Sequence, residues 1–221
     1  MRIAVTGSKG QLGRSLQAEL QGHELLLIDL PEYDFTDPGI VEVIADFQPE
    51  VVIHAGAYTN VDKAEREPET CYRVNVFGTH NVALACQRCG AVLVHISTNE
   101  VFDGTSHKPY LEYDRPNPIS TYARSKWMAE QVVRDLVQRF YIVRTAWLYA
   151  QGGTNFPSKI MAAADKHGRL RVVRDEFGSP TYAPDLAQAI HQLIQTGHYG
   201  VYHFTNEGAC SRYEFALKIL E

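Results

Sequence analysis

The chain has 221 residues and a formal net charge of −5, with 45% hydrophobic and 21% charged residues, which is ordinary for a globular protein. This length can bury the core of one domain, or of one domain with a small appendage. A negative charge without any basic run excludes an electrostatic footprint for nucleic acid or an anionic membrane surface. Met1 leads directly into the strand-like RIAVTG and no apolar run approaches ~20 residues, so we expect a cytoplasmic enzyme without a membrane partner.

Strand-like and helix-like patterns alternate through the first 150 residues. Continuous apolar strands separated by amphipathic helices indicate a parallel sheet covered on both faces, and hence a Rossmann-type, doubly wound α/β fold. The expected strands are 2–7, 23–30, 50–57, 91–98 and 140–147, and the expected helices are 11–20, 38–48, 62–89 and the stretch around 120–130.

Beyond residue 150 the alternation loosens. Ser211 and Glu214 form a capping box that should open the last helix. We expect a dinucleotide-binding domain over 1–150 and a small substrate-binding lobe over 151–221, with the substrate between them at the carboxyl end of the sheet. In this second part the patterns predict helices at 154–168, 182–197 and 211–221 and strands at 170–175 and 200–206.

The first strand runs into TGSKGQLG, which places Gly7, Gly10 and Gly13 between a strand and a helix. Glycines there let the backbone approach a pyrophosphate at a helix N-terminus, although a tight structural turn is the alternative. Asp29 ends the second strand sixteen residues after Gly13 and can accept hydrogen bonds from an adenosine ribose, unless it is simply solvated. The pattern predicts NAD or NADP, with NADH favoured because the Asp29 carboxylate repels a 2′-phosphate and the following LPEYD contains no Arg or Lys.

Three polar residues predict the chemistry. Tyr122 and Lys126 are four residues apart in a predicted helix and therefore share one face, and Thr98 ends a predicted strand. A phenol with a pKa near ~10 is a poor acid–base catalyst at neutral pH, so we expect the Lys126 charge to lower the Tyr122 pKa. Thr98 can then hydrogen-bond the oxygen that gains or loses the proton during hydride transfer.

Cysteine usage predicts no disulfide framework and no metal site. Cys86 and Cys89 form a CxxC, which can indicate redox chemistry or half of a zinc site. No second CxxC or paired histidine completes such a site, so we interpret both as half-buried helix cysteines.

Together, GxxGxxG, Ser-Thr and YxxxK resemble the extended short-chain dehydrogenase/reductase superfamily that acts on nucleotide sugars. The segments 57–65, 144–150 and 177–187 are similar to the dTDP-4-dehydrorhamnose reductase family within it, and the resemblance runs along nearly the whole chain. It implies an NAD(P)-dependent oxidoreductase of dTDP-rhamnose biosynthesis. Its reaction would transfer hydride to the C4 keto group of a dTDP-4-keto-6-deoxy sugar.

The resemblance also implies roles for single residues. Thr98, Tyr122 and Lys126 match the catalytic triad, and Lys126 also reaches the cofactor. The implied phosphate loop is Gly7, Gly10, Gln11, Leu12 and Gly13, the adenine contact is Asp34 and Phe35, and the turn under the cofactor is Ala55, Gly56, Ala57 and Tyr58. The substrate side would hold Thr59, Asn99, Glu100 and Trp147, with Thr145 near the nicotinamide.

Two of these positions have open alternatives. Trp147 could be a core residue rather than a wall of the sugar pocket. Lys63 could meet a substrate phosphate or merely pair with Glu67 one helical turn away.

The chain departs from the family in two places. Members usually continue beyond the position at which this chain stops, and they typically carry an aspartate and an aromatic residue in place of Asn99 and Glu100. A nucleotide-sugar dehydratase or epimerase is therefore one alternative, although an amide at Asn99 cannot donate the proton that dehydration needs. A non-catalytic subunit resembling the regulatory partner of methionine adenosyltransferase is another, and the intact Thr, Tyr and Lys argue against it. The exact sugar, a homodimer and a metal-supported assembly stay open.

Overall fold

The computed structural model describes all 221 residues. Its main sheet has six strands in the order β2-β1-β3-β4-β5-β9, and every neighbouring pair is parallel. The predicted doubly wound parallel sheet is confirmed. Its strands are β1 (Arg2–Thr6), β2 (Glu24–Ile28), β3 (Val51–His54), β4 (Val92–Thr98), β5 (Phe140–Thr145) and β9 (Gly200–His203).

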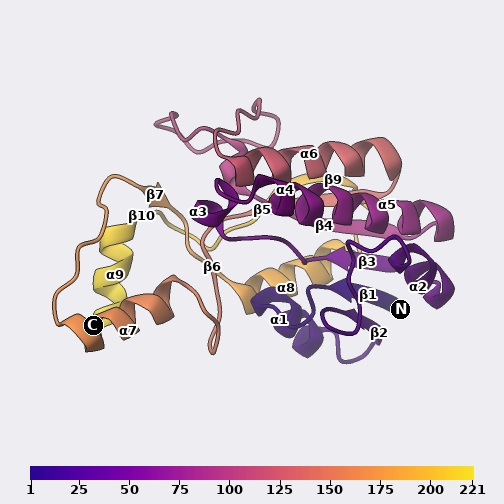
Figure 1. The fold of residues 1–221 in the computed structure, drawn as a ribbon, viewed down its shortest axis with the longest axis horizontal. Helices are drawn as coiled ribbons and strands as arrows, with labels where there is room; N and C mark the ends of the chain where they lie inside the picture. The colour runs from indigo at the N-terminus through magenta and orange to yellow at the C-terminus, as the bar shows by residue number, and fades with distance from the viewer.

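Helices cover both faces of this sheet (Figure 1). On one face α1 (Gln11–Glu19) packs beside α8 (Ala183–Leu193), and on the other lie α2 (Ile40–Phe47), α5 (Gly78–Cys89) and α6 (Thr121–Leu136). Two apolar clusters fill the two interfaces, so successive residues of one strand enter opposite cores. In β1, for example, Ala4 joins one cluster and Ile3 and Val5 join the other. This two-sided burial explains the continuous apolar runs.

The predicted long helix over 62–89 is broken into shorter pieces. These are α3 (Val61–Ala64), α4 (Pro68–Tyr72), a π-helical turn η1 (Arg73–Phe77) and then α5. π-helical turns are rare and frequently occur at functional sites. Here η1 carries Asn75, whose contacts are described below.

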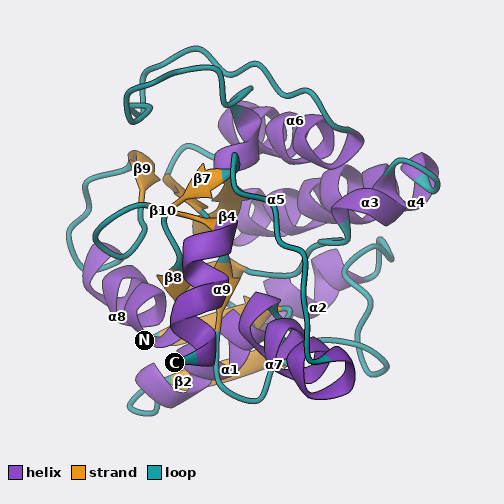
Figure 2. Cartoon of the chain, turned by 90° about the vertical axis from the view of Figure 1, so that its left-hand side faces the viewer, coloured by secondary structure: helices purple, strands orange, loops and turns teal.

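The chain beyond residue 150 contributes to two separate bodies. α8 and β9 belong to the main sheet and its covering layer. The rest forms what we call the outer lobe: α7 (Phe156–His167), α9 (Arg212–Leu220), and the antiparallel pair β7 (Phe177–Gly178) and β10 (Cys210–Ser211). It stands off the carboxyl edge of the sheet (Figures 1 and 2). The outer lobe therefore contains fewer residues than the lobe expected over 151–221, because α8 and β9 belong to the main domain.

Local patterns in this region had mixed success. The capping box is confirmed, because the Ser211 side chain accepts from the Glu214 N–H and the Glu214 carboxylate accepts from the Ser211 N–H. The strand predicted over 170–175 is wrong: this stretch is a loop, and Val173 in it is 54% exposed. No neighbouring strand offers it a ladder partner, so its apolar residues have no core to enter.

Two short connections complete the fold around the sheet edge. β4 is followed at once by the 3-10 turn η2 (Asn99–Val101), and β5 leads through a bend into β6 (Leu148–Tyr149), which pairs with β8 (Thr181–Tyr182). No helix combines the length and the apolar character needed to cross a membrane.

Candidate active site

A cavity of about 880 Å³ opens at the carboxyl ends of β1 to β5, between the sheet and the outer lobe. In a doubly wound sheet this edge is where ligands bind. The structure brings these predicted site residues, but not Lys63, to its wall: Gly7, Gly10, Gln11, Leu12, Gly13, Asp29, Asp34, Phe35, Ala55, Gly56, Ala57, Tyr58, Thr59, Thr98, Asn99, Glu100, Tyr122, Lys126, Thr145 and Trp147.

The glycine loop at the start of α1 is shaped by close backbone contacts. Gly7 has a φ of +66°, and a Cβ there would lie 2.6 Å from the Gly56 Cα. A Cβ on Gly13 would lie 2.2 Å from the Gly7 carbonyl oxygen. No side chain caps the N-terminus of α1 at Gly10, so its first N–H groups have no side-chain acceptor. The loop therefore offers free donors and positive dipole charge to an anion, which fits a pyrophosphate.

Asp29 lies beside this loop and is already held by the backbone. Its Oδ2 accepts from the Lys9 N–H at 2.7 Å and its Oδ1 from the Leu30 N–H at 2.8 Å. Each carboxylate oxygen keeps a second lone pair for a ribose hydroxyl. Asp34 is similarly occupied, because its Oδ1 accepts from the Thr36 N–H at 2.8 Å.

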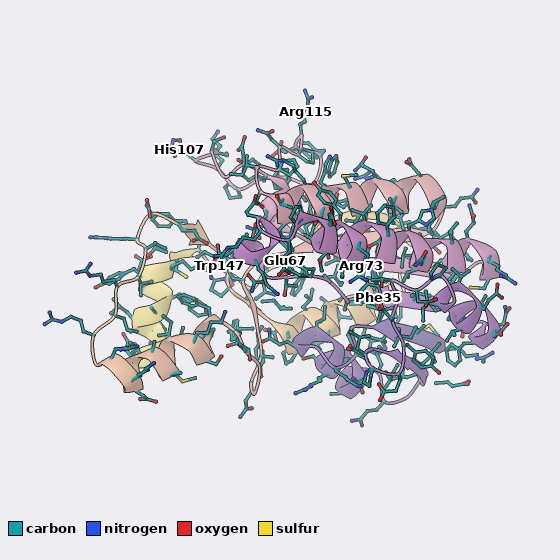
Figure 3. The ribbon with its side chains drawn as sticks, in the orientation of Figure 1. Phe35, Glu67, Arg73, His107, Arg115 and Trp147 are labelled. Atoms are coloured by element: carbon teal, nitrogen blue, oxygen red, sulfur yellow. The ribbon has the colours of Figure 1, made fainter.

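Phe35 seals the floor of the predicted adenine end. Cβ atoms on Gly56 and Gly78 would each come within 2.5 Å of its ring, so a side chain at either position would collide with Phe35. The ring also meets His54 edge to face, with centroids 5.2 Å apart. Figure 3 shows Phe35 close to the sheet, whereas His107 and Arg115 project away from it at the top of the view.

A buried chain of hydrogen bonds supports the turn at Gly56. The Thr79 hydroxyl donates to the Asn75 carbonyl at 2.6 Å, so at 3.0 Å it must accept from His54 Nε2. The His54 Nδ1 then accepts from Thr6 Oγ1 at 2.6 Å, and that oxygen accepts from the Gly56 N–H at 3.2 Å. Burial, with help from the nearby Lys126 charge, lowers the pKa of His54 to about 3, so the ring is neutral.

Asn75 holds the next part of the turn. Its Oδ1 accepts from the Tyr58 N–H at 2.8 Å, and its Nδ2 donates to the Tyr58 carbonyl at 3.1 Å and to Ser125 Oγ at 2.8 Å. One buried amide thus ties the cofactor-side turn to α6. On the exposed side of this region Lys63 pairs with Glu67 at 3.2 Å, as the one-turn spacing predicts.

The predicted catalytic groups lie on β4 and α6. The Thr98 hydroxyl accepts from the Glu100 N–H at 3.2 Å and donates to Asn99 Oδ1 over a long 3.4 Å, a weak hydrogen bond that a substrate oxygen can replace. Ser120 caps α6 and sets the helix direction, which puts Tyr122 and Lys126 on the cavity side. The buried Lys126 Nζ donates to the Ile96 carbonyl at 2.7 Å.

The direction of the Tyr122 pKa shift differs from the prediction. Burial raises the pKa of Tyr122, the Glu100 charge raises it further, and the Thr98 hydroxyl opposes the shift. The expectation that Lys126 lowers it is wrong here, because loss of water around the phenol dominates. Burial lowers the pKa of Lys126 to about 8 while the Glu130 carboxylate opposes that change. At neutral pH the site holds a neutral phenol and an ammonium.

A fully buried ion pair fixes the helix that carries both groups. Glu130 receives Arg144 Nε at 2.9 Å and Nη2 at 2.7 Å, and Ser97 Oγ at 2.6 Å. Glu130 is one turn beyond Lys126 on α6, Ser97 precedes Thr98 on β4, and Arg144 is on β5. The network therefore joins β4 and α6, the two elements that carry the triad, to the neighbouring strand β5.

On the outer side of the cavity Trp147 is sandwiched. The Arg212 guanidinium lies 3.6 Å from the indole centroid, and a Cβ on Gly178 would lie 2.6 Å from Trp147 Cε2. Trp147 has a φ of +48°, a left-handed conformation that is rare for a bulky residue and frequent at functional sites. Figure 3 shows it between the sheet and the outer lobe. Trp147 is thus a wall of the cavity rather than a core residue.

The two residues that depart from the family occupy different positions. Asn99 is exposed, whereas Glu100 is partly buried and makes no side-chain hydrogen bond within the protein. Burial and the negative charge of Glu176 raise the pKa of Glu100, and Arg212 opposes the shift. Glu100 is therefore a carboxyl group available to a ligand.

Two residues that shape the site, Asn155 and Arg212, were missed from the sequence. Gln11 Oε1 accepts from the Ala150 N–H at 2.9 Å and from Asn155 Nδ2 at 2.7 Å, so its side chain ties the glycine loop to the outer lobe. Arg212 reaches the cavity as the first residue of α9. Nothing in the local pattern around Asn155 or Arg212 indicates this, because their partners are far away in the chain.

The RmlD substrate binding domain family matches residues 1–221. The chain belongs to this family. The dTDP-4-dehydrorhamnose reductase of Mycobacterium tuberculosis (strain ATCC 25618 / H37Rv) is 42% identical over all of this RmlD-family chain and 75% of its own length. The spore coat polysaccharide biosynthesis protein SpsK of Bacillus subtilis is 39% identical over all of this chain and 78% of its own length.

Solved structures agree. The dTDP-4-dehydrorhamnose reductase of Bacillus anthracis in complex with NADP has a TM-score of 0.96 and 42% identity, over 99% of this chain and 79% of that chain. The Bordetella bronchiseptica enzyme WbmG in complex with NAD has a TM-score of 0.86 and 25% identity, over all of this chain and 77% of its own. The resemblance inferred from the motifs is confirmed.

Proposed function

We propose that this RmlD-family chain is an NAD(P)H-dependent reductase that acts on the C4 keto group of a dTDP-4-keto-6-deoxy sugar. The observation that carries the proposal is the shared cavity, on whose wall the glycine loop and the Thr98, Tyr122 and Lys126 side chains all lie. The similar reductases of Mycobacterium tuberculosis and Bacillus anthracis support the choice of substrate.

The cavity fits a dinucleotide on three observations. The glycine loop leaves no room for side chains and presents uncapped N–H groups. The Asp29 carboxylate lies beside that loop. At the other end Thr145 lines the cavity, and its buried Oγ1 has no partner within the protein. The loop would hold the pyrophosphate, Asp29 the ribose and Thr145 the nicotinamide, and the bound NAD(P)H supplies the hydride.

The side chains then manage the proton. Tyr122 is neutral because burial raises its pKa, so it can donate its proton to the alkoxide that forms at C4. The Lys126 ammonium, one turn away on α6, would bind the nicotinamide ribose of the cofactor. Thr98 can redirect its hydroxyl proton from the long hydrogen bond with Asn99 to the same substrate oxygen. Reprotonation of Tyr122 from solvent completes the cycle.

The coenzyme preference and the setting of the protein are further proposals. The Asp29 charge favours NADH, whose ribose carries a hydroxyl where NADPH carries a phosphate. The cytoplasmic location and the homodimer expected from the sequence stay predictions, and size-exclusion chromatography with light scattering tests the second.

The test is an assay with two substrates. Purified protein is mixed with NADH or NADPH and an enzymatically prepared dTDP-4-keto-6-deoxy sugar, and absorbance at the reduced-nicotinamide band is followed while the product is identified. We expect one coenzyme oxidised for each sugar reduced. With dTDP-glucose and NAD⁺ we expect no 4-keto-6-deoxy product, since Asn99 has no proton to give. Catalytic dehydration without net coenzyme consumption would replace the reductase with the dehydratase alternative.

A further inference from the structure

Glu100 is a carboxyl group without a partner on the wall of the cavity. It is partly buried, and its side chain makes no hydrogen bond or ion pair within the protein. Members of the family typically carry an aromatic residue at this position, so the carboxyl group is a departure of this chain. A carboxyl group that has lost part of its water is stabilised by a hydrogen-bond donor on a ligand.

The charged side chains around Glu100 do not supply this donor. Arg212 Nε donates to Glu176 Oε1 at 3.0 Å, and its guanidinium lies 3.6 Å from the centroid of the Trp147 indole. Burial raises the pKa of Glu100, and the negative charge of Glu176 raises it further. The donor that completes this part of the cavity therefore has to come from the substrate.

Glu100 lies beside the position proposed for the C4 oxygen of the sugar. Its N–H donates to the Thr98 hydroxyl at 3.2 Å, which fixes its backbone next to that catalytic group. After burial, the Glu100 charge is the next cause that raises the pKa of Tyr122. The Glu100 carboxyl group is thus close to both side chains that would contact the C4 oxygen, and it faces the substituents on the ring carbons next to C4.

The chemistry of these neighbouring carbons identifies the partner. C5 of a 6-deoxy sugar carries a methyl group and the ring oxygen, and neither can donate a hydrogen bond. C3 carries a hydroxyl group, whose proton can be donated to a carboxylate oxygen. Reduction changes only C4, so this hydrogen bond can persist from substrate to product.

We propose that Glu100 is a specificity-determining residue that accepts a hydrogen bond from the C3 hydroxyl group of the keto sugar. The protein then reduces sugars with a hydroxyl group next to the C4 carbonyl in preference to 3-deoxy sugars. This inference rests on the proposed function, because it places the C4 carbonyl at Thr98 and Tyr122.

The experiment compares kcat/KM for a dTDP-4-keto-6-deoxy sugar and for its 3-deoxy analogue. The unaltered protein should prefer the 3-hydroxy sugar at least about tenfold, and Glu100→Leu should lower this preference about tenfold. Glu100→Gln keeps an acceptor oxygen and should retain most of the preference. Glu207→Leu is the matched control, because Glu207 is exposed and outside the cavity, and it should keep the full preference.

The change between proteins reports on Glu100, because the C3 hydroxyl group alters the reactivity of the ketone equally in every variant. NADH titration should show unchanged affinity in all variants, which establishes that each is folded. If Glu100→Leu reduces neither sugar, calorimetric binding of the two reduced products gives the same comparison. An equal preference in the unaltered protein and in Glu100→Leu would overturn the role of Glu100, while reduction of the sugar would still support the proposed function. Reduction of neither sugar by the unaltered protein would overturn the proposed function and this inference with it.

Discussion

The two halves of the cavity are built in different ways. The half proposed for the cofactor is built from backbone: Gly7 and Gly13 pack against main-chain atoms, and the uncapped start of α1 supplies N–H donors. The half proposed for the sugar is built from side chains, with Glu100, Trp147 and Arg212 coming from three distant parts of the chain. A site that binds through backbone groups can be recognised in the sequence by its contiguous glycine motif. A site that binds through side chains has residues far apart in the sequence, which only the folded structure brings together.

Tyr122 lies where the two halves meet, and removing its hydroxyl should reduce activity more than any other change considered below. Tyr122→Phe should lower kcat by about 10²–10⁴-fold while coenzyme affinity stays unchanged, because only the acidic hydroxyl is lost. Steady-state kinetics and coenzyme titration measure the two quantities. Tyr113→Phe is the matched control, since Tyr113 is 83% exposed and outside the cavity. Near-normal turnover by Tyr122→Phe would remove Tyr122 from the mechanism.

A single added methyl group in the glycine loop should weaken coenzyme binding. In Gly13→Ala the new Cβ would lie 2.2 Å from the Gly7 carbonyl and 2.6 Å from the Ser8 Cα, and neither atom can move freely. We expect the free energy of unfolding to fall by about 1–3 kcal/mol and coenzyme binding to weaken at least tenfold, as followed by urea denaturation and titration. Gly22→Ala, where no atom lies within 4 Å, should change neither. Normal coenzyme affinity in Gly13→Ala would contradict the backbone account.

The buried histidine under Gly56 should make the same half sensitive to acid. The folded-state pKa of His54 is about 3, below the 6.5 of the unfolded chain, so the unfolded state binds more protons between these values. The contribution of His54 to the free energy of unfolding is therefore fully present above pH 6.5. It falls as the pH is lowered, by up to about 1.4 kcal/mol per pH unit for one histidine.

Urea denaturation between pH 7.5 and 5 measures this loss, which should reach about 2 kcal/mol from His54 alone. His95, whose pKa burial also lowers, adds to the slope. His54→Gln should show a shallower slope, and a variant of His107, which is exposed, should not. A free energy of unfolding that stays constant over this range would show that His54 is not buried as a neutral ring.

Substitutions in the side-chain half should have the smallest effect, and they should change the binding of the sugar but not of the coenzyme. Arg212→Gln removes the guanidinium from the face of Trp147 and should raise KM for the sugar about tenfold, with coenzyme affinity unchanged. Glu176→Gln breaks the 3.0 Å ion pair but leaves the guanidinium, so it should cost less. Equal losses in both variants would indicate that Arg212 only supports the outer lobe.

The sequence predicted the two halves unequally, for a physical reason. Local patterns in the sequence predicted the alternation of strands and helices. They also predicted the glycine loop, Asp29 and the Tyr122–Lys126 pair, and all of these residues line the cavity. The Asn75 clamp on Tyr58 and the Arg212 stack on Trp147 depend on contacts across 17 and 65 residues, which no local pattern encodes. The Tyr122 pKa was predicted in the wrong direction because burial, and not only the nearest charge, determines it.

The most direct test follows the hydride itself. The protein is incubated with coenzyme deuterated at the transferable C4 position of the nicotinamide and with a dTDP-4-keto-6-deoxy sugar, and the product is analysed by NMR and mass spectrometry. The account predicts one deuterium, bonded to C4 of the reduced sugar and present in stoichiometric amount. Deuterium at another carbon, or an unlabelled product with the coenzyme unchanged, would contradict the assignment of a C4 keto-sugar reductase.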